Sequence, residues 1–95
     1  QMITAVRQVV ADQATSKGTI DLFERSIRPA LEKSGIASTQ EMDSIAGKLR
    51  NIQTLAIPEQ QRLGIAKRLL LQSSAGWAAS AASRAGFKSM EWAIP

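Results

Sequence analysis

Apolar residues recur every three or four positions along almost the whole chain, and this spacing constrains the fold more than any other feature of the sequence. Such a period places apolar side chains on one face of an α-helix, whereas a half-buried β-strand needs strict alternation. No alternation longer than a few residues occurs. The length of 95 residues suits one core and not two. The sequence therefore predicts an all-α fold, a compact single domain of five to six short helices over residues 1–95.

The first third of the chain predicts two helical segments. The first covers residues 2–15 and is expected to end at Gly18, since glycine commonly follows the last turn of a helix. The second is expected to begin at a cap on Thr19 and to end at Gly35. Pro29 lies inside this second pattern. Proline lacks the amide that an α-helix needs, so we expect either a kink near residues 25–28 or two short helices.

A third helix has a clear local start signal. Ser38 is followed three residues later by Glu41, the spacing of a capping box, in which the serine oxygen accepts a backbone amide of the first turn. An apolar stripe then continues to Leu55. Pro58 suits the first turn of a fourth helix, which is predicted to reach Gln72.

The last quarter of the chain is rich in alanine and serine. Ser73 or Ser74 is expected to cap a fifth helix that ends at Gly86, and the final segment, residues 87–95, is predicted to form a short lid helix or turn. Small side chains in the fifth helix would allow close packing inside the domain.

Several absences bound the function. The chain has no cysteine, histidine or tyrosine, and most zinc sites and acid–base relays use histidine. We therefore expect a non-catalytic protein with no cofactor or metal. The lack of cysteine fits a reducing compartment, which favours an intracellular, cytoplasmic location. The longest apolar runs are a few residues, far from the roughly 20 that cross a bilayer, so no membrane span is expected.

The charge distribution supplies the candidate binding site. The formal net charge is +4, and between residues 60 and 90 every charged side chain is basic. These basic residues fall between the apolar stripes, so their charged ends are expected to reach water and to make one face of the second half positive. The candidate partner-binding residues on this face are Arg62, Lys67, Arg68, Arg84 and Lys88.

Three interpretations of this basic face stay open. A solvated face that keeps the domain soluble is the commonest explanation of a charge run. Binding of an acidic protein segment comes next, and direct binding of nucleic acid last, because the charge is modest and no nucleic-acid-binding motif is present. Core burial is the simpler interpretation for both tryptophans, Trp77 and Trp92. An exposed Trp92 beside Lys88 would add an apolar anchor to a peptide-binding surface, so it joins the candidate site.

The basic stretch of residues 62–88, followed by the aromatic segment of residues 87–92 in a helical unit of this length, resembles the C-terminal domain of a rhabdovirus phosphoprotein of the plant-infecting kind. In that family the domain binds the nucleoprotein–RNA template and tethers the polymerase to it. The resemblance implies a nucleoprotein–RNA complex as the partner, with the five basic residues at the contact. No motif carries any single residue's role across, and the oligomeric state is not specified.

The predicted cap gives a direct stability test. Replacing Ser38 by alanine removes the oxygen that accepts a free amide of the helix, so the free energy of unfolding is expected to fall by about 1 kcal/mol. Urea denaturation followed by circular dichroism measures the change. An unchanged midpoint would contradict a helix start at this residue.

Overall fold

The computed structural model describes the backbone of residues 2–93 and the side chains of residues 3–83. Within the described residues the chain forms helices and no strand, so the all-α prediction is confirmed. The elements are α1 (Met2–Ala11), α2 (Ser16–Leu22), the π-helical turn η1 (Phe23–Ile27), α3 (Arg28–Ser34), α4 (Thr39–Gln53) and α5 (Glu59–Ala93). Helices α2, η1 and α3 follow one another without a break and make one rod, so the described backbone forms four rods.

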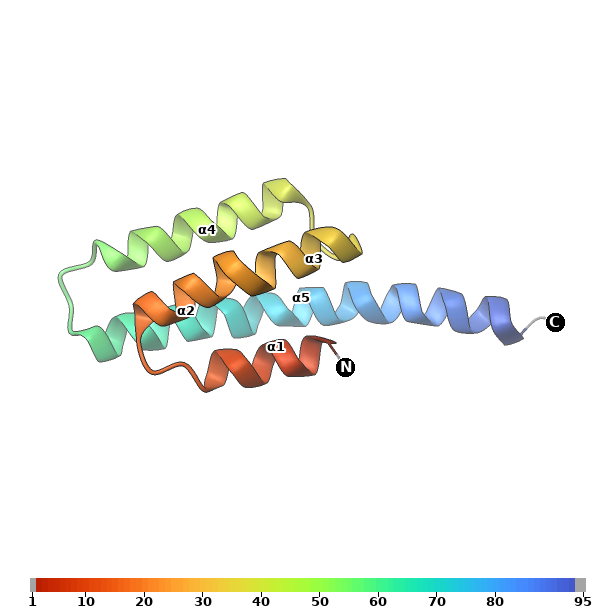
Figure 1. Cartoon of the computed structure of the whole chain (residues 1–95), viewed down its shortest axis with the longest axis horizontal. Coiled ribbons are helices and arrows are strands. Elements are labelled where there is room, and N and C mark those ends of the chain that lie inside the picture. The colour runs from red at the N-terminus through yellow and green to blue at the C-terminus, as the bar shows by residue number, and fades with distance from the viewer. Residues whose placement is uncertain (1, 94–95) are drawn as a thin grey trace.

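Helix α5 organises the arrangement. Its first half contacts α1, α2 and α4, and it runs antiparallel to α4 (Figure 1). Its second half continues past the ends of the other rods, so the molecule measures 58 × 25 × 18 Å. The radius of gyration of 15.0 Å exceeds the roughly 13 Å of a globular domain this long. The single domain is thus a helical body with one helix extending from it.

One apolar core fills the body. Residues Ala66, Leu70 and Trp77 of α5 lie four and seven positions apart, hence on one face, and all three are buried. The prediction that Trp77 belongs to the core is confirmed, since its exposed fraction is 2%. The other rods bury the side chains that complete the core: Ile3, Val6 and Val10 of α1, Phe23, Ile27 and Leu31 of the second rod, and Met42, Ile45, Ala46, Leu49 and Ile52 of α4.

The predicted boundary at Gly18 is wrong. Helix α1 ends at Ala11, and α2 begins three residues before the expected cap at Thr19, which is buried. The cap is Thr15, whose hydroxyl oxygen accepts the Gly18 amide at 3.0 Å. A Cβ on Gly18 would lie 2.9 Å from that same oxygen. Gly18 therefore lies in the first turn of α2, where its missing side chain leaves room for the Thr15 cap, and it does not end a helix.

The disturbance expected at Pro29 is confirmed and takes the form of the π turn. The amide of Arg28 bonds to the carbonyl of Phe23, five residues earlier. Since Pro29 has no amide to offer the Arg25 carbonyl, the ordinary α pattern is already broken at this point. Phe23, Ile27 and Leu31, each four residues apart, all remain buried on the core side of this rod.

The predicted start of the third helix is confirmed. Ser38 is extended, and its hydroxyl oxygen accepts the Glu41 amide at 3.1 Å. The preceding rod ends at Gly35, whose φ of 73° lies in the left-handed region that glycine adopts without strain.

The predicted division of the last third is wrong, because one helix of 35 residues replaces the fourth and fifth helices and the terminal segment. Ser74 does not cap a new helix: its buried hydroxyl donates to the Leu71 carbonyl of the same helix at 2.6 Å. The alanines that follow have the highest helix propensity, and Trp77 continues the core stripe, so nothing interrupts the helix. The start after Pro58 agrees with prediction, as its carbonyl accepts the Arg62 amide.

Burial ranks the leucines of α5. Leu70 is fully buried, whereas Leu63 and Leu69 are half-buried. Replacing Leu70 by alanine empties a core site and is expected to lower the free energy of unfolding by about 2–5 kcal/mol. Leu69→Ala is the matched control and should cost clearly less, because part of its surface already contacts water. Equal losses in urea denaturation would contradict this packing.

Candidate functional site

A groove runs along the body between α4 and α5. It consists of two adjoining hollows of about 380 and 570 Å³, and Lys48 and Gln72 border both. The smaller hollow is mainly apolar and is lined by Lys48, Ile52, Ile65, Arg68, Leu69 and Gln72. The larger hollow has small and polar walls that include Ser44, Ser73 and Gly76 and carries Glu41 at its margin. We call the two hollows together the α4–α5 groove.

Two cations stand on opposite walls of the apolar hollow, Lys48 on α4 and Arg68 on α5. Both residues are exposed. Among residues 3–83 no carboxylate lies within ion-pair distance of either. Arg68 Nε donates to the Gly64 carbonyl of its own helix, at 3.4 Å. Their charges are therefore available to a negatively charged group that enters the groove.

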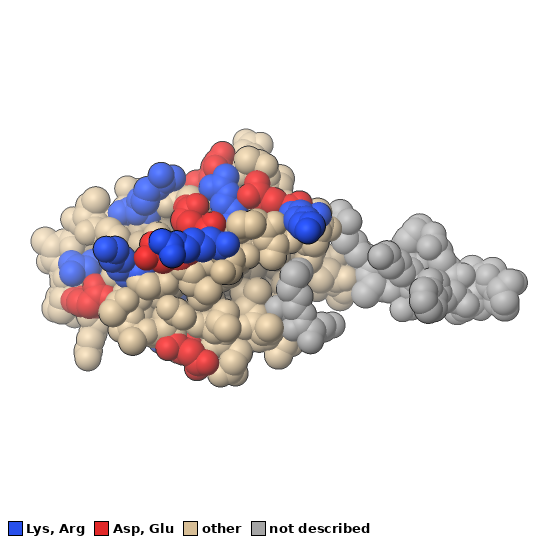
Figure 2. All heavy atoms as spheres, in the orientation of Figure 1, with Lys and Arg blue, Asp and Glu red and all other residues tan. Residues whose placement is uncertain are grey.

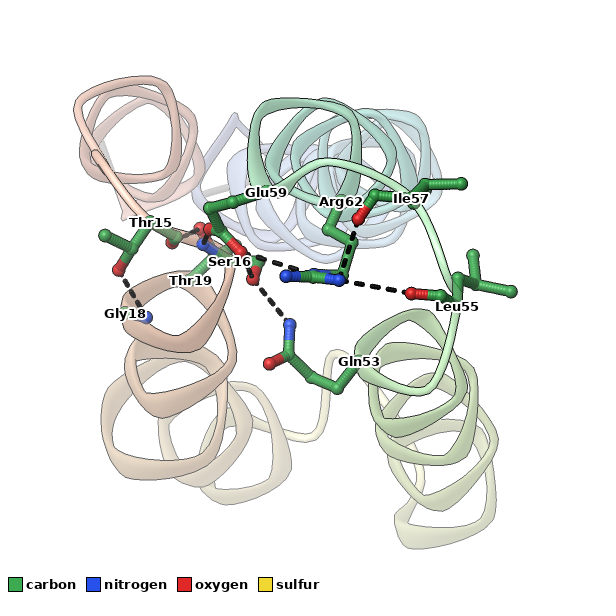
Figure 3. A network of polar contacts seen from close by, with 9 residues as sticks. All are labelled: Thr15, Ser16, Gly18, Thr19, Gln53, Leu55, Ile57, Glu59 and Arg62. Atoms are coloured by element: carbon green, nitrogen blue, oxygen red, sulfur yellow. Dashed lines mark hydrogen bonds and ion pairs between the residues drawn. The ribbon is translucent and has the colours of Figure 1, made fainter.

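Arg62, a candidate from the sequence, is used inside the fold. Its Nη1 donates to the carbonyls of Leu55 and Ile57 at 3.1 and 2.8 Å, and its Nε lies 3.3 Å from a carboxylate oxygen of Glu59 (Figure 3). The side chain is half-buried, in contrast to the expectation that its charged end reaches water freely. Arg62 thus fixes the loop between α4 and α5.

Lys67 also differs from the expectation that its charged end reaches water freely. Its ammonium group donates to the Ala11 carbonyl at 2.7 Å. Ala11 is the last residue of α1, where unpaired carbonyls and the helix dipole favour a cation. Lys67 therefore joins α5 to the end of α1.

Arg28 shows how charge is balanced elsewhere on the surface. Its guanidinium forms ion pairs with Glu24 and Glu32 of its own rod and with Asp43 of α4. The hydrogen bonds that its guanidinium donates to Asp43 and then to Glu32 raise the pKa of Arg28. On the face shown in Figure 2, basic and acidic side chains likewise lie next to one another. The groove differs from this surface because its two cations form no ion pair with a carboxylate of residues 3–83.

Of the five basic residues predicted from sequence, the structure leaves only Arg68 both described and free of a structural bond to another element. The side chains of Arg84, Lys88 and Trp92 lie outside the described residues. Lys48 was not among the predicted site residues. Its only sequence signal is its spacing of three and four from Ile45 and Ile52, and that signal has meaning only once α4 is known to face α5.

Glu59 forms a polar junction at the start of α5, the helix that makes one wall of the groove. Its carboxylate accepts the amide of Ser16 at 2.6 Å and the hydroxyl of the same residue at 2.7 Å, while Gln53 from the end of α4 donates to that hydroxyl oxygen (Figure 3). The Ser16 amide, then its hydroxyl, then Arg62 lower the pKa of Glu59. The starts of α2 and α5 and the end of α4 meet here.

Comparisons with known proteins identify no relative. No protein-family model matches the chain, and neither a curated protein nor a solved structure is similar to it at a significant level. Within the described residues, no three acidic, histidine or cysteine side chains gather in a metal-binding arrangement. No helix there is long and apolar enough to span a membrane. The groove and its charges therefore carry the functional argument alone.

The Glu59 contacts predict a pH-dependent stability. A carboxylate whose folded pKa is depressed stabilises the fold above its unfolded pKa, about 4.3, and this contribution is lost as the pH falls through the lower folded value. Glu59→Gln removes the titrating group, so the variant should lose less stability between about pH 5 and pH 3 than the parent. Urea midpoints across this range measure the slopes. Parallel slopes would contradict the assignment.

Proposed function

We propose that this chain is a non-catalytic protein-interaction domain that binds an acidic segment of a partner protein in the α4–α5 groove. The observation that supports the proposal is the pair Lys48 and Arg68, which form no ion pair with a carboxylate of residues 3–83 and lie on opposite walls of an apolar hollow. A partner with carboxylates beside apolar side chains satisfies both features at once. Complementary charge then orients the partner, and the apolar walls supply affinity.

The same observations favour protein over nucleic acid. Nucleic-acid binding depends on many phosphate contacts and on aromatic side chains that stack on bases. The groove offers two cations and walls of isoleucine and leucine. The two aromatic side chains described, Phe23 and Trp77, are buried in the core. Direct binding of nucleic acid is therefore the alternative that the test has to exclude.

The resemblance to rhabdovirus phosphoproteins implies one particular partner, a nucleoprotein on its RNA template. This assignment stays a prediction, since the comparisons bear on it in neither direction. It is compatible with the groove only if the nucleoprotein presents an acidic, partly apolar segment.

The test compares two charge reversals of equal size. A fluorescent peptide of about 18 residues, composed of glutamate, leucine and alanine, serves as the acidic probe, and an oligouridylate of about 12 nucleotides serves as the RNA probe. The peptide is expected to bind with a Kd below about 1 mM, and Lys48→Glu with Arg68→Glu should weaken it at least about tenfold. Arg7→Glu with Lys33→Glu, the matched control outside the groove, should leave binding nearly unchanged.

Anisotropy titrations measure both probes, and melting temperatures confirm that all variants fold. Tighter binding of the RNA, with a steep loss of affinity as salt rises, would assign the surface to nucleic acid. An absence of peptide binding at about 1 mM, or equal losses in the two double variants, would overturn the proposal.

A further inference from the structure

The shape of the α4–α5 groove restricts the conformation of its occupant. On each wall the lining residues recur every three or four positions, for example Ile65, Leu69, Gln72 and Gly76 on α5. The walls are therefore single faces of two antiparallel helices (Figure 1). From Ile65 to Gly76 the α5 wall extends about 16 Å, the length of about three helical turns.

The two hollows of the groove suit different side chains of an occupant. The apolar hollow is lined by Ile52, Ile65 and Leu69, with a cation on each side, and so suits large apolar side chains of an occupant. The lining of the larger hollow includes the small residues Ser44, Ser73 and Gly76, and a partner's backbone can approach closely at these positions. Glu41 at this margin repels acidic groups. The occupant is thus acidic and apolar at one end and small and uncharged at the other.

Gly76 adds an energetic argument. Glycine inside a helix costs about 1 kcal/mol relative to alanine. A Cβ on Gly76 would meet nothing within 4 Å, so no contact in the described structure requires a glycine there. A Cβ on Gly64 of the same helix would likewise meet nothing within 4 Å, and Gly64 does not line the groove, which makes it a matched control.

From these features we infer that the groove binds its partner as an amphipathic α-helix, packed alongside α4 and α5, with acidic residues on both sides of an apolar stripe and a small residue against Gly76. This inference rests on the proposed function and specifies its partner. A helix presents apolar side chains at the three- and four-residue spacing of the walls, and its two flanks carry the carboxylates that reach Lys48 and Arg68. An extended strand would present side chains alternately to opposite sides and could reach only one wall with each set.

The experiment uses two acidic peptides of equal charge and length. One has leucines at helical spacing with glutamates on both flanks, and the other differs only by proline at two central positions, which breaks the helix. The first is expected to gain helical circular-dichroism signal on binding, and the second to bind at least about tenfold more weakly. Equal affinities would overturn the helical inference and leave the proposed function standing. Failure of both peptides to bind would remove the proposed function itself.

The glycine provides a second readout. Gly76→Leu fills the groove and is expected to weaken the helical peptide by about tenfold or more, whereas Gly64→Leu should leave its affinity within about twofold. At both positions an added Cβ meets nothing within 4 Å, and circular dichroism verifies that the leucine variants fold. Gly76→Ala, the smaller change, gives the same direction if the leucine variant is unfolded. Unchanged affinity in a folded Gly76→Leu variant would contradict close packing of a helix at this end.

Discussion

The carboxylate of Glu59 holds together the three parts of the chain on which the rest of the structure depends. A helix begins with amides that have no partner within the helix, and its positive dipole end favours a negative charge. The carboxylate of Glu59, the first residue of α5, supplies a hydrogen-bond acceptor and a negative charge to Ser16 at the start of α2. Gln53 from the end of α4 completes the junction by donating to the Ser16 hydroxyl oxygen. This junction and the Arg62 bonds to the α4–α5 loop determine the distance between the end of α4 and the start of α5. The separation of the groove walls is therefore set by polar contacts at one end and by the core along their length.

The basic residues of the described chain divide by their environment. The charged groups of Arg28, Arg62 and Lys67 bind carboxylates or carbonyls of the fold, so replacing these residues mainly lowers the stability of the domain. Lys48 and Arg68 make no such bond to another element among residues 3–83. A run of basic residues in a sequence does not show which of them bind within the fold and which stay available to a partner. That distinction depends on where the hydrogen-bond acceptors lie, and some acceptors belong to distant segments, such as the Ala11 carbonyl that binds Lys67.

Local chemistry was readable from the sequence, and long-range geometry was not. The Ser38 cap and the disturbance at Pro29 could be predicted because hydroxyl, amide and missing amide lie within one or two turns. The continuity of α5 through Ser74 was missed, since small polar residues signal a boundary unless the next turn returns a core side chain such as Trp77. The groove was missed for a different reason. It exists only where particular faces of α4 and α5 meet, and the periodicity of either helix alone does not reveal its neighbour.

The π turn at Phe23–Ile27 gives the second rod one residue more than regular α geometry would need. Its hydrogen bond spans five residues, whereas an α-helical bond spans four. The wider turn accommodates the additional residue locally, so α3 keeps its orientation, with Leu31 in the core and Arg28 beside Asp43. In α2 or α3 a lost residue has no such outlet and would turn every later side chain by about 100°. During divergence of such a sequence, the π turn is consequently the place in this rod where a change of length disturbs the core least.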